Sequence, residues 1–151
     1  NIKNPVTGEL HSTKHSIDVF EDLNIADSLL KQNKMKTNLD AFTISEILIN
    51  EDSTQGDYYS LRGLAYFQRA QLQNNAKEIM EKSKQDLIRA TESRNINVDY
   101  IAKAYMILSD IYLFNEDLQN ADRAIKKALR ANKRIEGVVK KLKNINKIKL
   151  Q

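Results

Sequence analysis

The chain has 151 residues, no cysteine and a net charge of +4. This length buries enough core for one domain to fold without disulfides or a structural metal, and the lack of cysteine excludes thiol nucleophiles and zinc sites with cysteine ligands. Only four Gly and one Pro occur, too few for many tight turns or glycine-rich phosphate loops, whereas good helix formers are abundant. We therefore expect an all-α protein.

Residues 1–17 contain Pro5, Gly8 and several Thr and Ser, and we expect them to form an extended arm. His11 and His15 lie in this arm, at a spacing that would place both imidazoles on one side of a helix as a metal pair. No third ligand at a fixed spacing accompanies them, so the pattern favours ordinary surface histidines. Because the chain has no other His and no Cys, it offers no nucleophile with a base. We expect no enzymatic activity, no cofactor and no small-molecule substrate.

Residues 25–48 show a weak helical pattern of apolar and small residues, which predicts two helices. The second of these helices fits two registers. In one register the inward-facing residues are Asn38, Phe42 and Ser45, and in the other they are Ala41, Ser45 and Leu48. The pattern alone leaves both registers open.

Residues 57–93 predict a pair of longer helices, each with small or aromatic residues on one face. These residues are Tyr59, Gly63 and Tyr66 in the first helix and Ser83, Leu87 and Ala90 in the second. Gly63 and Ser83, at the point where the two helices should meet, are 20 residues apart.

Residues 102–132 contain the clearest helical pair, with spacings of three and four residues along each face. The inward-facing residues are Tyr105, Leu108, Ser109 and Tyr112, followed by Leu118, Ala121, Ile125 and Ala128. A short polar break ends at Asp117, whose carboxylate suits the N-cap of the second helix. Ser109 and Ala121 are 12 residues apart, eight fewer than the corresponding spacing in residues 57–93. Since eight residues are close to two helical turns, we expect both earlier helices to be about one turn longer.

The pattern of residues 102–132 resembles a tetratricopeptide repeat, a helix–turn–helix unit of about 34 residues with aromatic, small and Ala positions in a fixed order. Ser109 replaces the usual Gly, Ile125 the usual aromatic residue and Lys133 the closing Pro. Residues 57–93 resemble a second repeat and residues 25–48 a degenerate one.

The resemblance implies that residues 18–132 form antiparallel helical hairpins stacked as a short right-handed superhelix. Arg62 departs from it in the second repeat, at a position where Leu is expected.

Residues 133–151 predict a basic amphipathic helix despite Gly137. Its apolar stripe consists of Ile135, Val138, Val139, Leu142, Ile145 and Ile148. Residues 123–151 hold 11 Lys or Arg against one acid, a charge of +10, whereas residues 1–122 hold 13 basic and 19 acidic residues, a charge of −6. We expect this helix to pack on the last repeat as a cap. The alternative is a terminal piece of a longer repeat protein, in which this helix packs on a further repeat.

The resemblance also implies a concave groove, lined by the first helix of each repeat, that binds a peptide or a partner helix. The groove positions of the second repeat correspond to Ser60, Leu64, Phe67 and Gln68. Those of the third repeat correspond to Lys103, Met106, Asp110, Leu113 and Phe114. The alternative for the four apolar residues Leu64, Phe67, Leu113 and Phe114 is that they belong to the core.

Chaperone-binding members of the family hold a C-terminal carboxylate with a clamp of Lys, Asn and Arg. Ser60, Leu64, Met106 and Asp110 occupy the comparable places here, so the clamp is missing. We therefore expect a non-catalytic scaffold or adaptor that binds another protein or peptide within a larger assembly.

The alternative function is an electrostatic tether, in which residues 123–151 hold the domain on nucleic acid or an anionic membrane. No aromatic residue follows Phe114, which argues against recognition of unpaired bases by stacking.

The mature chain is expected to be soluble, because no stretch approaches the roughly 18 consecutive apolar residues of a membrane-spanning helix. It begins with Asn1 rather than Met, which indicates that a targeting segment, a neighbouring domain or other residues preceded it. Abundant Asn, Lys and Ile suggest a bacterium with an AT-rich genome. If the missing start was a signal segment, the expected location is the cell envelope or periplasm, with the cytoplasm as the alternative. The sequence leaves the oligomeric state open.

Overall fold

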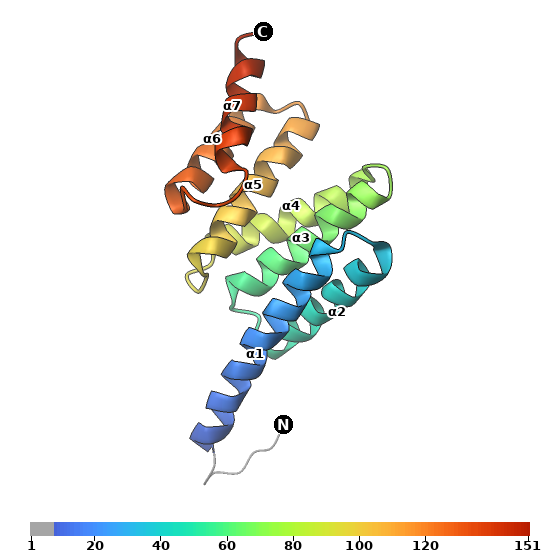
Figure 1. Ribbon diagram of the computed structural model, residues 1–151, viewed down its shortest axis with the longest axis vertical. Coiled ribbons are helices and arrows are strands. Elements are labelled where there is room, and N and C mark those ends of the chain that lie inside the picture. The colour runs from blue at the N-terminus through green and yellow to red at the C-terminus, as the bar shows by residue number, and fades with distance from the viewer. Residues whose placement is uncertain (1–7) are drawn as a thin grey trace.

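The computed structural model describes the backbone of residues 8–151 and the side chains of residues 19–151. The described residues form seven helices (Figure 1). These are α1 (Gly8–Lys31), α2 (Met35–Glu51), α3 (Gly56–Leu72), α4 (Lys77–Glu92), α5 (Val98–Phe114), α6 (Leu118–Ala131) and α7 (Val138–Lys149). Within this part of the chain the only β pairing is an isolated bridge between Gln55 and Asn95. The expected all-α class is confirmed.

Helix α1 begins at Gly8, so residues 8–17 are helical where an extended arm was expected. The sequence from Gly8 to Lys31 contains no Pro and no internal Gly, so nothing in it stops the helix from extending toward the N-terminus. Residues 1–7 lie outside the described part, as do the side chains of His11 and His15.

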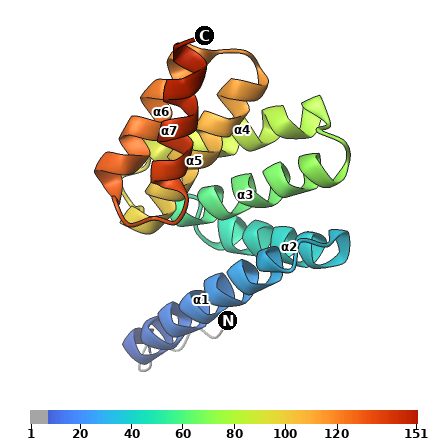
Figure 2. The ribbon, with the colours of Figure 1, turned by 45° about the horizontal axis from the view of Figure 1, so that its top comes forward.

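Consecutive helices pack against each other along the chain, and the first helices of successive pairs, α1, α3 and α5, also touch. The turns within the pairs span residues 32–34, 73–76 and 115–117. Figures 1 and 2 show α1 and α2 at one end of the molecule, α6 and α7 at the other, and α3 to α5 between them. The molecule is therefore a stack in which each helix mainly contacts its neighbours.

The eight additional residues between Gly63 and Ser83 lie almost entirely in helix, as their spacing predicted. The helices as a whole are not each one turn longer, however, because α3 and α5 both have 17 residues and α4 has 16 against 14 in α6. Helix α3 continues for nine residues after Gly63, whereas α5 continues for five after Ser109. Helix α4 has six residues before Ser83, whereas α6 has three before Ala121. Only one of the eight additional residues lies in the connection.

Each of these pairs has one point where the helix backbones come close. Ser83 Oγ of α4 donates a hydrogen bond to the Gly63 carbonyl of α3 at 2.7 Å. Ser109 Oγ of α5 donates to the Ala121 carbonyl of α6 at 2.8 Å. A Cβ atom added to Gly63 would lie 2.6 Å from the side chain of Leu87, so α3 approaches α4 closely because Gly63 has no side chain.

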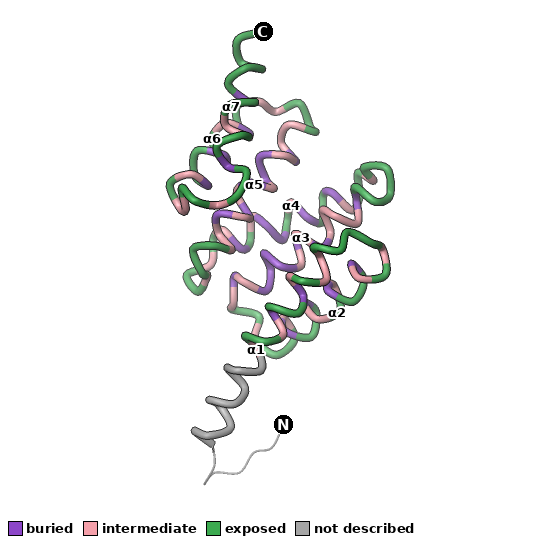
Figure 3. Tube along the Cα trace, viewed as in Figure 1, coloured by how far each residue is buried: buried purple, intermediate pink, exposed green. Residues whose placement is uncertain are grey.

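The core is divided into three clusters along the stack. The first joins α1, α2 and α3, the second joins α3, α4, α5 and α6, and the third joins α5, α6 and α7. Figure 3 shows the buried residues concentrated in the middle of the stack, with exposed residues at the turns and along α7. Among the side chains of residues 19–151, no single buried cluster spans the stack.

The first helical pair adopts the second of the two registers considered for residues 25–48. Ala41, Ser45 and Leu48 are all buried, and Ala41 and Leu48 pack in one cluster with residues of α1. Phe42 is only partly buried and stacks edge to face on Tyr66 of α3, with ring centroids 4.9 Å apart. Asn38 is buried too, but it points to α3, where its Nδ2 donates to the Ala65 carbonyl at 2.8 Å.

Helix α7 packs against α6 at the C-terminal end of the stack. Val138 and Ile145 are buried there, and Leu142 is partly buried beside them. Val139 and Ile148, which belonged to the same predicted stripe, remain exposed. The apolar stripe of α7 is therefore wider than the surface that packs against α6.

Candidate functional site

Helix α5 carries a row of residues, three or four positions apart, that lines two successive hollows. These residues are Asp99, Lys103, Met106, Asp110 and Leu113. The first hollow lies between α3, α5 and the loop of residues 132–136, and the second lies between α5 and α7. We call them the apolar hollow and the basic hollow, and together the trough.

The apolar hollow has a volume of about 360 Å³. Its apolar lining consists of Leu64, Met106, Ile107 and Ile135. Its charged lining consists of Asp99, Lys103, Arg134 and Glu136. An apolar floor with a charged rim of both signs suits an apolar side chain whose backbone remains partly in water.

The loop of residues 132–136 is held against the start of α5 by hydrogen bonds. Asn132 Nδ2 donates to Asp99 Oδ1 at 2.7 Å, and Asn132 Oδ1 accepts from the Arg134 backbone N–H at 2.9 Å. Gly137 follows the loop with φ +86°, and a Cβ there would lie 3.6 Å from Met106 Cε. This left-handed conformation, which favours Gly, brings α7 back toward α5.

Polar contacts also fix α5 against the earlier helices, next to Asp99. Tyr100 donates its hydroxyl to Asp27 of α1 at 2.8 Å, and burial together with that carboxylate raises the pKa of the phenol. Asp57 of α3 accepts from the backbone N–H of Asn97 at 2.7 Å, while burial raises the pKa of its carboxyl. The trough therefore begins where α1, α3 and α5 are tied together.

The basic hollow has a volume of about 500 Å³ and is lined by four lysines and one aspartate. The aspartate is Asp110, whose two oxygens accept from Lys141 Nζ at 2.9 and 2.7 Å. No described carboxylate lies within ion-pair distance of Lys140, Lys143 or Lys147. The basic hollow is therefore positively charged and open to an anionic group.

Five of the nine groove residues expected from the sequence line the trough. They are Leu64, Lys103, Met106, Asp110 and Leu113. Of these, Met106 is only 8% exposed, so its accessible part is small.

Three of the other expected residues are engaged inside the fold. Ser60 is fully buried and donates to the Tyr100 carbonyl at 3.0 Å. Gln68 donates to the Leu30 carbonyl at 2.7 Å and joins the last turn of α1 to α3. Phe67 packs against the middle core cluster, which is the core alternative considered for it.

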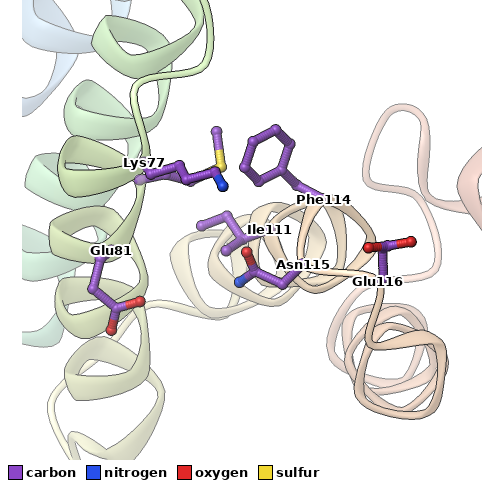
Figure 4. A pocket seen from close by; sticks show the side chains of 7 residues that line it. Lys77, Glu81, Ile111, Phe114, Asn115 and Glu116 are labelled. Carbon is purple, nitrogen blue, oxygen red and sulfur yellow. The ribbon is translucent and has the colours of Figure 1, made fainter.

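Phe114 lines a separate hollow of about 590 Å³ between α4 and α5 (Figure 4). In this view Lys77 of α4 and Phe114 of α5 reach toward each other above Ile111. Glu81 and Glu116 supply the acids of its lining. Because none of the residues of the row on α5 lines it, we do not include this hollow in the trough.

The loop of residues 132–136 and α7 also line the site, a contribution that was not predicted from the sequence. Family groove positions lie only on the first helix of each repeat, so Ile135 and the lysines of the basic hollow had no place in that pattern. The charge of +10 over residues 123–151 was the available signal. It identified the lysines as a group but gave no indication that α7 faces α5.

Among the described residues, no three His, Asp or Glu side chains gather as a metal-binding group. None of the helices, over that same part of the chain, combines the length and the apolarity needed to cross a bilayer. No protein-family model matches this chain, and no curated protein matches it in sequence. The candidate site therefore rests on the geometry of the trough.

Proposed function

We propose that this chain is a non-catalytic scaffold of the tetratricopeptide-repeat type that binds a segment of a partner protein in the trough. The observation that carries the proposal is the row of residues on α5. Its spacing follows the groove positions that the resemblance assigns to a first helix, and two hollows lie along it. The assignment to this type of repeat, including a right-handed superhelix, belongs to the same proposal.

The chemistry of the trough suits an extended or helical segment of protein. Leu64, Met106 and Ile135 offer an apolar floor, while Lys103 and Glu136 stand at the rim for polar contacts with the same segment. Peptide grooves in helical repeats commonly combine apolar anchor sites with such polar rims. The described part of the trough contains no nucleophile–base pair, so binding is the role that its side chains can perform.

The test is selection of random peptides on the purified chain, followed by fluorescence anisotropy on the enriched peptides. We expect Leu64→Gln to weaken their binding by about tenfold, the effect of losing one buried apolar anchor. The matched control is Leu39→Gln, because Leu39 lies exposed on α2, outside the trough. Equal binding to both variants, or a selection that enriches no common pattern, would contradict the proposal.

The alternative is an electrostatic tether to nucleic acid or an anionic membrane, supported by the lysines of α7. Lys140, Lys143 and Lys147 lie on one helix and have no carboxylate partner among the described residues. This function predicts binding to duplex DNA or phosphatidylserine vesicles that falls steeply as salt rises. It also predicts that Leu64→Gln has no effect on that binding.

A further inference from the structure

The basic hollow has a charge that the fold does not neutralise. Its lining of four lysines and one aspartate carries a net charge of +3. Asp110 is already shared by Lys141 at 2.7 Å. On another side of α7, Lys149 pairs with Asp122 of α6 at 3.4 Å. The acids of α5 and α6 therefore engage two lysines of α7 and leave three others facing the hollow.

The apolar and basic hollows follow each other along α5 in a fixed order. Met106 lines the first, and Asp110, one turn later, lines the second. The distance along the helix from Met106 to Leu113 is about 10 Å at a rise of 1.5 Å per residue. An extended peptide covers this distance with about three residues. A segment in the trough therefore places an apolar residue and an acidic block about three residues apart.

We propose that the trough binds an acidic segment of a partner protein, with an apolar residue in the apolar hollow and carboxylates against Lys140, Lys143 and Lys147. This inference rests on the proposed function and specifies the chemistry of the ligand. Charge complementarity selects the carboxylates, and the neighbouring apolar floor selects a protein segment over a nucleic acid. Neither hollow has an aromatic lining residue on which a base would stack.

The probes are short synthetic peptides with a pair of Leu and, about three residues away, a block of Glu. A matched peptide carries Gln in place of Glu, and a third has the order of its residues scrambled. We expect the Glu peptide to bind about tenfold more tightly than the Gln peptide at about 0.1 M salt, a difference that shrinks as salt rises. Equal binding of the Glu and Gln peptides would overturn the inference.

The triple variant Lys140→Gln, Lys143→Gln and Lys147→Gln should lose this tenfold advantage and bind the Gln peptide as the unchanged chain does. The control variant removes three exposed lysines from α2, its preceding turn and α4: Lys34→Gln, Lys36→Gln and Lys82→Gln. It loses the same formal charge and should keep the tenfold difference. A similar loss in both triple variants would overturn the inference, because the effect would then come from net charge alone. Circular dichroism confirms that both variants are folded.

Different results would contradict this inference and the proposed function. If Leu64→Gln abolishes binding while the Glu and Gln peptides bind equally, the scaffold stands and the acidic ligand is excluded. If none of the peptides binds, including those enriched by selection, both fall. Duplex DNA or phosphatidylserine vesicles that bind more tightly than the Glu peptide through the same lysines would replace the inference with the tether. Self-association of the chain that depends on these lysines would likewise overturn it.

Discussion

The α3–α4 and α5–α6 pairs make the same close contact with the serine on opposite helices. In the first pair Ser83 of the second helix donates to the carbonyl of Gly63 in the first helix. In the other pair Ser109 of the first helix donates to the carbonyl of Ala121 in the second. The two pairs also differ in the stretch of helix between this contact and the turn, which is about one turn greater on each helix of the α3–α4 pair.

The comparison shows that the close contact requires small residues on both helices but does not require the serine on a particular helix. A small residue is needed on both helices, because the backbones approach closely there. The hydroxyl can come from either side, since both helices present a carbonyl at the crossing. A family pattern that assigns one residue type to one position captures the need for a small residue there. It does not capture the freedom of the hydroxyl to come from either helix.

The largest expected effect comes from filling the space at Gly63. Gly63→Val should lower the free energy of unfolding by about 2–3 kcal/mol, because its side chain must enter space held by the buried Leu87. Urea denaturation followed by circular dichroism measures the change. The control is Gln71→Val at an exposed position of the same helix, which introduces the same side chain without a clash and should change the free energy of unfolding by about 0.5 kcal/mol or less. If Gly63→Val matches the unchanged chain, the two helices do not approach as closely as described.

An intermediate effect is expected from removing the two hydroxyls. Ser83→Ala and Ser109→Ala should each cost about 1 kcal/mol of unfolding free energy, the usual contribution of one buried hydrogen bond. Because the contacts are equivalent, the two losses should agree and should add in the double variant. A loss in one pair without a loss in the other would show that the two hydrogen bonds are not interchangeable.

The smallest effect is expected at the start of the second helix of each pair. Asp117, the N-cap of α6, accepts from the Asn120 backbone N–H at 3.1 Å. Ala76, the N-cap of α4, has no side-chain group that can accept such a bond. Ala76→Asp should raise the free energy of unfolding by about 0.5–1 kcal/mol. Asp117→Ala should lower the urea midpoint. A midpoint unchanged by either variant would show that these caps contribute nothing.

The Asp117 cap should also depend on pH. Hydrogen bonds from Asn120 hold the pKa of the Asp117 carboxyl below its usual value. A lowered pKa in the folded state means that the cap stabilises above the ordinary Asp value of about 4 and loses its effect as the pH falls through the lowered value. The difference in urea midpoint between the unchanged chain and Asp117→Ala should therefore shrink in acid. A difference that persists in acid would contradict the role of the ionised Asp117 carboxylate as the cap.

Sequence spacing predicted the features of this fold that repeat within one helix or between two adjacent helices. The placement of the additional residues of α3 and α4 in helix rather than loop, and the capping role of Asp117, followed from spacing and residue type. The expected greater total length of α3 is wrong, since α3 and α5 both have 17 residues. Four residues of the row on α5, Lys103, Met106, Asp110 and Leu113, were expected from the family resemblance, and their spacing of three and four residues places them on one face.

Contacts with more distant parts of the chain were not predictable in this way. Ser60 and Leu64 share one face of α3, but the close approach of α5 buries Ser60 and leaves Leu64 beside the apolar hollow. Gln68 is engaged because the C-terminal end of α1 presents the Leu30 carbonyl. The basic hollow depends on the return of α7 through Gly137. Periodicity identifies a face of a helix, but not which other helix covers it.

The stacking of each helix on its neighbours has a consequence for hydrogen exchange. Because the helices at the ends have fewer neighbours, they can open without unfolding the middle, so their backbone amides should exchange faster than those of α3, α4 and α5. The trough joins α3, α5 and α7. A bound segment therefore links an end of the stack to its middle and should slow exchange in α7 far more than in α4. Protection of a helix that opens easily is thus the expected signature of an occupied trough.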